Sequence, residues 1–353
     1  ATTEIYTLSL HDALPIVSGL PPFVAIDHEG GKVFRFGRRL TRLPAAAAMG
    51  VSGAAVSGPA MTAALKVAET AGAIAGTELA LLGITMNLAP VAESLDGFND
   101  AFLGDRAWSD DPRAAGTLAA AWAVACQSAG TLSVGKHFPG NAAGDPHRVL
   151  PRMTVPRVRL EGAYLAPFRA LIDAGVGAIM MSHAVVEAMD PEMPASLSPG
   201  VLALLRNELG FTGIILTDDL SMAAVAASVS RVNASSGTVT TPSADRTPGQ
   251  LAGMAAVAAI RAGVDMVMVT GHDEARAVSD ALQSAVRDGS ITETRLKDTV
   301  TRILRAKIRY GLMDAENPEY PVDRNVLGGQ LDAAVHQNRQ ALADAIAEAA
   351  DYR

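Results

Sequence analysis

The chain has 353 residues (36.4 kDa), 49% of them hydrophobic and 19% charged, which is typical of one large or two ordinary globular domains and excludes a disordered chain. Its net charge of -8 and pI near 5.4 argue against a general nucleic-acid binder, which needs a basic face. The single cysteine, Cys126, excludes an internal disulfide and fits a reducing compartment, and the longest apolar runs are too short to cross a bilayer.

The N-terminal residues differ in character from the rest of the chain. The stretch at 3–16, TEIYTLSLHDALPI, resembles the in-frame translation of a sequencing-adapter oligonucleotide. We therefore expect residues 1–16 to be an artefact outside the fold, although the pattern also permits a short amphipathic segment. On this interpretation the true N-terminus is missing, and the sequence carries no information about a signal peptide.

Six short apolar segments that end in polar residues are predicted to be strands. They cover residues 22–27, 83–91, 132–137, 177–183, 213–216 and 262–269. Segments with helical spacing lie between them, as at 59–82 and 113–129, and this alternation predicts parallel strands covered on both faces. Residues capable of chemistry follow all six strands, which favours a (β/α)8 barrel over a doubly wound sheet, where only the switch point is used.

Residues 227–250 interrupt this alternation. The segment is rich in Ser, Thr, Ala, Gly and Pro, which predicts a long loop, with a linker between two domains as the alternative. The alternation resumes at Leu251, which favours a loop inserted into one domain. After this loop we expect a helix at 291–311, an irregular stretch and an Ala-rich helix from Gln330. We place the catalytic domain at 17–312 and a C-terminal segment at 313–353.

The run at 136–151, KHFPGNAAGDPHRVLP, carries the clearest chemistry. Lys136 and His137 stand at the end of a predicted strand, and Asp145 and His147 follow in a Gly/Ala-rich loop. A cation with an imidazole, followed by a carboxylate–imidazole pair, suits binding a polar substrate and moving protons on it. From these residues alone, an ordinary polar loop after a buried strand is an equal alternative.

Seven motifs in order resemble family 3 glycoside hydrolases, and in particular the single-domain bacterial β-N-acetylglucosaminidases that recycle peptidoglycan. The motifs are AIDHEGGKVFRF (25–36), GITMNLAPVAES (83–94), LGDRAWSDDP (103–112), KHFPG (136–140), IMMSHAVV (179–186), PASLSP (194–199) and GFTGIILTDDLSM (210–222). The resemblance implies a (β/α)8 barrel whose first strand precedes residues 22–27. We therefore expect this chain to lack its first β/α unit, and an unclosed barrel with exposed strand edges predicts poor solubility.

The resemblance also implies the catalytic residues. Asp218 matches the nucleophile of a retaining glycosidase, which attacks the anomeric carbon and later leaves it. The alternative for Asp218 is a helix cap, a role that suits Asp219 better. His147 matches the general acid/base, oriented by Asp145, with a solvated loop histidine as the alternative.

The chain departs from the family in this loop. Asn141-Ala142 stand where the family usually has His-Gly, the loop is shorter, and Pro146 separates the two members of the pair. Because proline restricts the residue before it, Asp145 is driven toward an extended conformation. This departure affects the assignment of His147 as the general acid/base more than that of Asp218 as the nucleophile.

Four further residues match those that hold the sugar in this family: Asp27, Arg106, Lys136 and His137. Carboxylates and cations can hydrogen-bond vicinal hydroxyls, but Asp27 and Arg106 could instead form a buried ion pair. His183 and Met222 are expected to line the pocket or else to belong to the core. Glu93 stands where the family more often has Asp.

The resemblance implies a retaining exo-β-N-acetylglucosaminidase that acts on peptidoglycan fragments without a metal or organic cofactor. Its partner would be a saccharide or muropeptide, with no nucleic acid and no membrane span, and the protein would be a cytoplasmic monomer. The alternatives are another family 3 glycosidase, a glycoside phosphorylase or an inactive muropeptide-binding protein. A metal-dependent hydrolase is disfavoured because the histidines at 28, 137, 147 and 183 form no H-x-H or H-E-x-x-H pair.

Overall fold

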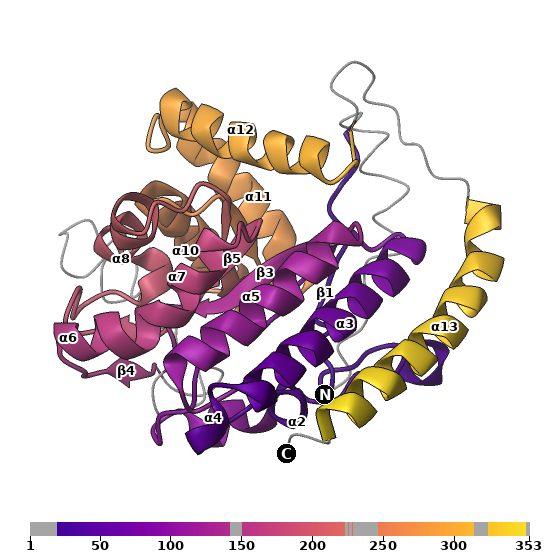
Figure 1. Cartoon of the computed structure of the whole chain (residues 1–353). Helices are drawn as coiled ribbons and strands as arrows, with labels where there is room; N and C mark the ends of the chain where they lie inside the picture. Colours follow the sequence, from indigo (N-terminus) through magenta and orange to yellow (C-terminus); the bar gives the residue numbers. More distant parts are fainter. Residues whose placement is uncertain are drawn as a thin grey trace.

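The computed structural model of the protein describes residues 20–141, 150–222, 246–313 and 324–350, together with Val225 and Ser228. In this part of the chain six parallel strands form one sheet in the order β1-β2-β3-β5-β7-β8, curled into a half-barrel with helices packed outside it (Figure 1). The strands are β1 (Ala25–Ile26), β2 (Met86–Asn87), β3 (Leu132–Phe138), β5 (Ala178–Met181), β7 (Ile214–Asp219) and β8 (Met266–Met268). A separate parallel pair joins β4 (Arg152–Met153) to β6 (Val185–Val186).

Each predicted strand segment overlaps one strand of this sheet, so the parallel α/β arrangement is confirmed. The residues of β1 and β8, the two edge strands of the described sheet, are half-buried, whereas β2, β3 and β5 are fully buried. Closure into eight strands and a missing first β/α unit stay predictions.

The helices follow the predicted alternation. The longer ones are α3 (Pro59–Leu81), α5 (Pro112–Ser128), α7 (Leu165–Asp173), α10 (Pro248–Ala262), α11 (His272–Arg287), α12 (Glu293–Arg309) and α13 (Arg324–Ala350). The shorter α, 3-10 and π segments are α2 (Ala46–Met49), α4 (Asp100–Leu103), α6 (Arg157–Arg159), α8 (Pro199–Ala203), η1 (Gly37–Arg39), η2 (Gly53–Ala55), η3 (Gly104–Arg106), η4 (Leu160–Tyr164), η5 (Ala195–Leu197) and η6 (Leu204–Glu208). None of the helices in the described residues is both long and apolar enough to cross a membrane.

Two predicted boundaries are wrong. The segment expected to be a loop through residue 250 already contains the first turn of α10, because Thr247 and Gln250 form a capping box that starts the helix at Pro248. The last helix begins at Arg324 rather than at Gln330. The intervening pair Gly328-Gly329 lowers the local helix propensity, so the pattern alone places the start after it. Residues 229–245 and 314–323, and the N-terminal segment 1–16, lie outside the described residues.

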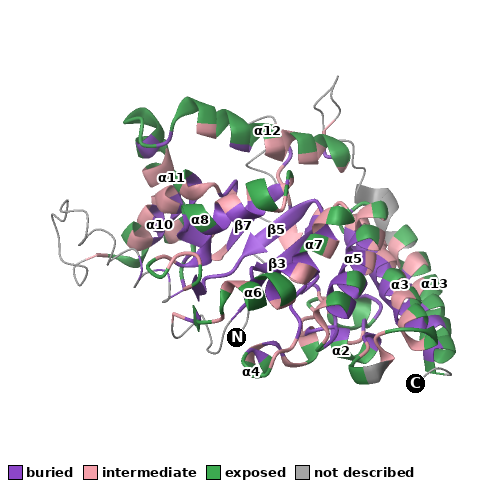
Figure 2. Cartoon of the chain, turned by 60° about the vertical axis from the view of Figure 1, so that its left-hand side comes forward, coloured by how far each residue is buried: buried purple, intermediate pink, exposed green. Residues whose placement is uncertain are grey.

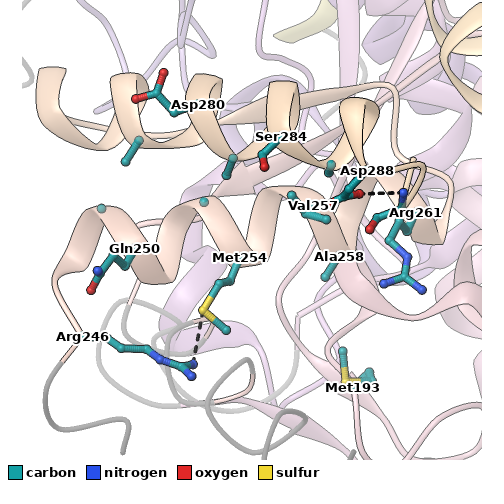
Figure 3. Close-up of a pocket in the computed structure, with 16 residues that line it drawn as sticks. Met193, Arg246, Gln250, Met254, Val257, Ala258, Arg261, Asp280, Ser284 and Asp288 are labelled. Atoms are coloured by element: carbon teal, nitrogen blue, oxygen red, sulfur yellow. Dashed lines mark hydrogen bonds between the residues drawn. The ribbon is translucent and has the colours of Figure 1, made fainter. Parts of the chain in front are cut away.

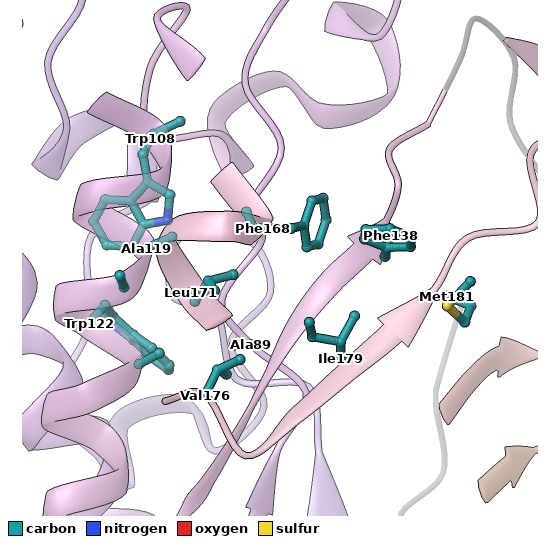
Figure 4. Packing of buried hydrophobic residues seen from close by; sticks show 14 of the residues in the cluster. Ala89, Trp108, Ala119, Trp122, Phe138, Phe168, Leu171, Val176, Ile179 and Met181 are labelled. Atoms are coloured by element: carbon teal, nitrogen blue, oxygen red, sulfur yellow. The ribbon is translucent and has the colours of Figure 1, made fainter. Parts of the chain in front are cut away.

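Side chains alternate along the strands and so divide the core between two faces of the sheet. On the inner face, opposite α3, α5, α7 and α10, the buried residues of the strands pack with Ile303, Ala306 and Tyr310 from α12 and the residue that follows it. A register shift in β3 between Gly135 and Phe138 interrupts the alternation. Phe138 thereby reaches the outer face and meets Phe168 of α7 edge to face, with ring centroids 5.1 Å apart (Figure 4). Figure 2 shows the result, a buried sheet between helices whose outer surfaces are exposed.

The buried carboxylate of Glu78 joins three segments that are distant in sequence. Its oxygens accept hydrogen bonds from the Thr41 backbone N–H (2.9 Å), the Thr41 hydroxyl (2.6 Å) and the side-chain amide of Asn338 (3.0 Å). Glu78 lies on α3 and Asn338 on α13, so this carboxylate fastens the C-terminal helix to the body of the fold.

We expect Glu78→Ala to lower the free energy of unfolding by about 3 kcal/mol, because it removes the acceptor of the buried Thr41 N–H and of the half-buried Asn338 amide and leaves the Thr41 hydroxyl only the longer contact to Val335 O. Urea denaturation followed by circular dichroism measures the change. Glu69→Ala, at an exposed position of the same helix, is the control and should change stability by under about 0.5 kcal/mol. A loss below about 1 kcal/mol in the Glu78 variant would contradict this role.

Candidate active site

Strand alternation brings three of the predicted residues to one end of the sheet. The inner-face positions of β1, β3 and β7 include Ala25, Val134 and Leu216, which pack in the inner core. Two positions later in the sequence, each of these segments carries a charged residue: Asp27 after Ala25, Lys136 after Val134 and Asp218 after Leu216. Because parallel strands end at the same edge, the carboxyl ends of these strands present two carboxylates and a cation on the same side.

Lys136 is the centre of a buried ion network. Its ammonium lies 2.6 Å from Asp27 Oδ1 and 2.7 Å from Glu29 Oε1, and its side chain is 3% exposed. Glu29 in turn receives two hydrogen bonds from Arg106, from Nε at 2.8 Å and from Nη2 at 2.9 Å. The alternative of a direct Asp27–Arg106 ion pair is therefore wrong, because Glu29 stands between the two cations.

The network keeps its members charged. Burial acts to lower the pKa of Lys136, but the carboxylates of Asp27 and Glu29 outweigh it and hold that pKa above its usual value. Burial acts to raise the pKa of Glu29, yet Lys136 and Arg106 hold it well below its usual range. The Asp27 side chain is 34% exposed and the Glu29 side chain only 8%, so Asp27 is the carboxylate that a ligand can reach.

The two adjacent aspartates at the end of β7 have different roles. Asp219 accepts hydrogen bonds from the N–H of Ser221 (2.9 Å) and from the N–H (3.2 Å) and hydroxyl (2.9 Å) of Thr270, so it holds the turn after the strand. Asp218 accepts one described hydrogen bond, from the Asp219 N–H at 2.8 Å. Asp219 therefore holds the turn and Asp218 does not, while a helix-cap role for either residue stays a prediction because most residues after Met222 lie outside the described residues.

Asp218 is ionised at neutral pH. Burial acts to raise the pKa of this carboxyl, but positive charge on His137 and His183 when these rings are protonated, the hydrogen bond from the Asp219 N–H and the Lys136 ammonium hold the pKa below its usual range. A nucleophilic carboxylate must be deprotonated, so this environment suits attack on an electrophilic carbon.

His183 and Met222 are both buried. Both ring nitrogens of His183 are hydrogen-bonded, Nδ1 to the Ser196 hydroxyl (2.8 Å) and Nε2 to the Asp219 carbonyl (3.1 Å), and the residue is 1% exposed. Burial lowers the pKa of His183, so the ring is neutral and its Nε2–H donates to the carbonyl of Asp219. Met222 is 7% exposed. Lys136 and His137 are equally buried, at 2% and 5% exposed, so burial does not separate the two alternatives, and a place in the pocket stays a prediction for both residues.

His137 is buried at the same strand end, with Nδ1 2.7 Å from the carboxylate of Glu93. The remaining two predicted residues, Asp145 and His147, lie outside the described residues, which stop at Asn141 and resume at Leu150.

Sequence reasoning missed Glu29 as a site residue and left the part played by Glu93 open. The signal for Glu29 was its position two residues after Asp27, directly beyond a predicted strand that ends in polar residues.

A groove of about 790 Å³ lies elsewhere, on the outside of the fold between α10 and α11 (Figure 3). Its polar lining includes Arg246, Arg261, Asp280 and Asp288. None of the predicted site residues lines this groove, so the convergence of strand ends, rather than the hollow, marks the candidate active site. In the described part of the chain no three His, Cys, Asp or Glu side chains gather as metal ligands.

The sequence matches the family described as Glycosyl hydrolase family 3 N terminal domain over residues 9–306. A curated beta-hexosaminidase from Alkalilimnicola ehrlichii is 36% identical over 270 residues, which is 76% of this chain and 70% of the relative. A family 3 beta-N-acetylglucosaminidase from Paenibacillus sp. has a similar structure, with a TM-score of 0.73 and 30% identity over 92% of this chain and 58% of that one. NagZ from Neisseria gonorrhoeae gives a TM-score of 0.66 and 28% identity over 93% of this chain and 82% of that one.

His28, which stands between Asp27 and Glu29 in the sequence, is a buried histidine that should make stability depend on pH. It is 1% exposed, its ring centroid lies 4.6 Å from that of Phe34, and its Nδ1 has no described hydrogen-bond partner. Burial, followed by repulsion from Arg35, lowers the pKa of His28 to about 4. The folded protein therefore resists protonation of this ring.

We expect His28 to make the fold acid-sensitive between pH 6.5 and pH 4. Because its folded pKa is about 4 and its unfolded value 6.5, the unfolded state binds the proton first, so stability is complete above pH 6.5 and falls as the pH decreases. The loss from this group should reach about 2 kcal/mol at about pH 5. Urea denaturation at several pH values should show that His28→Gln removes this part of the pH dependence.

His272→Gln, at an exposed position at the start of α11, serves as the control for this measurement. The control should keep the pH dependence of the wild-type protein. An identical pH dependence in wild type and His28→Gln would contradict the prediction.

Proposed function

Because the chain belongs to glycosyl hydrolase family 3 and is a glycoside hydrolase of the β-N-acetylhexosaminidase type, we propose that it is a retaining exo-β-N-acetylglucosaminidase. We propose that its substrates are peptidoglycan-derived fragments that carry a terminal GlcNAc, and that it acts as a cytoplasmic monomer. The proposed reaction type rests on Asp218, an ionised carboxylate at the end of β7. The turn after this strand is held by Asp219 and not by Asp218.

The proposed reaction has two steps. Asp218 attacks the anomeric carbon and forms a glycosyl ester while the glycosidic bond breaks, and the leaving oxygen takes a proton from a general acid. Water then attacks the same carbon, gives a proton to the same group, and releases GlcNAc and the free carboxylate. By the sequence resemblance that group is His147, assisted by Asp145.

The ion network supports recognition of a sugar. The Lys136 ammonium has three N–H donors and uses two of them on Asp27 and Glu29, which leaves one for a sugar hydroxyl. Asp27 receives Lys136 on Oδ1, so its second oxygen can accept from a neighbouring hydroxyl. A donor and an acceptor side by side match a vicinal diol, and Arg106 and His137 complete the proposed set.

A fluorinated slow substrate of the 2-deoxy-2-fluoro type should label Asp218 covalently. The reason is that such a substrate forms the glycosyl ester faster than water removes it. Mass spectrometry of peptides after the exposure locates the label. Asp218→Asn should abolish labelling and lower kcat by roughly four orders of magnitude.

Asp219→Asn is the matched control, since it changes the adjacent carboxylate that holds the turn but should still be labelled at Asp218. Labelling of another residue in a folded protein would overturn the assignment. Binding of GlcNAc without labelling or turnover would instead support a muropeptide-binding protein.

A further inference from the structure

Glu93 is a buried carboxylate that serves two residues at once. It follows β2 in the chain, is 4% exposed, and accepts from four donors. Oε1 receives His137 Nδ1 (2.7 Å), the His137 N–H (3.3 Å) and the Asn141 side-chain amide (2.9 Å), and Oε2 receives the Asn141 N–H. These four contacts use the acceptor capacity of an ionised carboxylate.

This arrangement selects one tautomer of His137. A carboxylate can only accept, so the hydrogen between Glu93 and the His137 ring belongs to Nδ1. The amide nitrogen of Asn141 lies 3.2 Å from the same Nδ1, but both groups are donors, so Asn141 gives its hydrogen to Glu93 instead. In the neutral form of the ring, Nε2 therefore carries the lone pair, and no described residue hydrogen-bonds to it.

The same carboxylate fixes the chain after β3. Asn141 is 2% exposed and is held to Glu93 through both its backbone and its side chain. In sequence it stands four residues before Asp145 and six before His147. Glu93 thus sets the orientation of His137, a proposed sugar-binding residue. It also fixes Asn141, which precedes the proposed proton-transfer pair in the sequence.

We propose that Glu93 is a positioning residue that holds His137 in its Nδ1–H tautomer, so that Nε2 accepts a hydrogen bond from a sugar hydroxyl beside the Lys136 donor. The role of the hydroxyl rests on the proposed function, whereas the tautomer does not. Glu93 itself touches no reacting atom, since its oxygens are occupied by His137 and Asn141.

The first test is nitrogen-15 NMR of the histidine rings in the full chain at about pH 8.5, where an unperturbed imidazole is neutral. Wild type should show His137, assigned by its absence in His137→Gln, as the Nδ1–H tautomer. Glu93→Met, which keeps the length of the side chain and removes the acceptors, should release the ring to its intrinsic mixture of tautomers. Asn141→Ala should keep the wild-type tautomer, because the Glu93 acceptor is unchanged.

Glu78→Met is the matched control, because Glu78 is also a buried carboxylate that accepts from an asparagine amide, but on α3 and α13. It should lose stability without a change at His137. Glu93→Gln supplies a second test if Glu93→Met does not fold: the weaker amide acceptor should move the His137 Nδ1 resonance.

Calorimetric titration with GlcNAc is the second readout. Glu93→Met should bind it about tenfold more weakly than wild type, while Glu78→Met stays within about twofold. Retention of the Nδ1–H tautomer in Glu93→Met, its loss in Asn141→Ala, or an unmoved Nδ1 resonance in Glu93→Gln would each overturn the proposal. If wild type binds no GlcNAc, the proposed function fails, but the tautomer measurement still decides the role of Glu93.

Discussion

The alternation of side chains along parallel strands is the constraint on which the rest of this structure depends. Inner-face residues such as Val134 and Leu216 form the core of the half-barrel. The next inner-face residues, Lys136 and Asp218, reach the strand ends and share an edge because the strands are parallel. Register shifts in β3 between Gly135 and Phe138 and in β7 between Leu216 and Asp219 lie at these strand ends, so the positions of Lys136 and Asp218 depend on them as well as on the alternation.

Burying charge at this edge requires compensation, and the structure supplies it with pairs of carboxylates that have different roles. Glu29 is buried between Lys136 and Arg106, whereas Asp27 is partly exposed. In the same way Asp219 is used by the turn, whereas Asp218 has one described hydrogen bond. A buried cation without such partners would lose its charge. Glu29 keeps Lys136 charged, and this leaves Asp27 and the ammonium of Lys136 able to bind a ligand.

Much of the fold and part of the site follow from the sequence. Apolar segments with helical spacing between them are sufficient to predict parallel strands, and α3, α5 and α12 lie close to where the periodicity places them. Asp27, Lys136 and Asp218 are found because they stand at the ends of recognisable strands and match motif residues of the family. Glu93 is not, because its partners His137 and Asn141 are more than 40 residues away and are brought to it only by the pairing of β2 with β3.

The sequence by itself determined the family, the parallel α/β architecture and the polar strand ends, since these depend on local periodicity and on the identity and order of motif residues. Only the tertiary structure decided which carboxylate meets which cation, and that Arg106 pairs with Glu29 and not with Asp27. It also decided that Glu93 serves His137. The physical reason is that ion pairing and burial depend on distances between segments far apart in the chain, which no local pattern specifies.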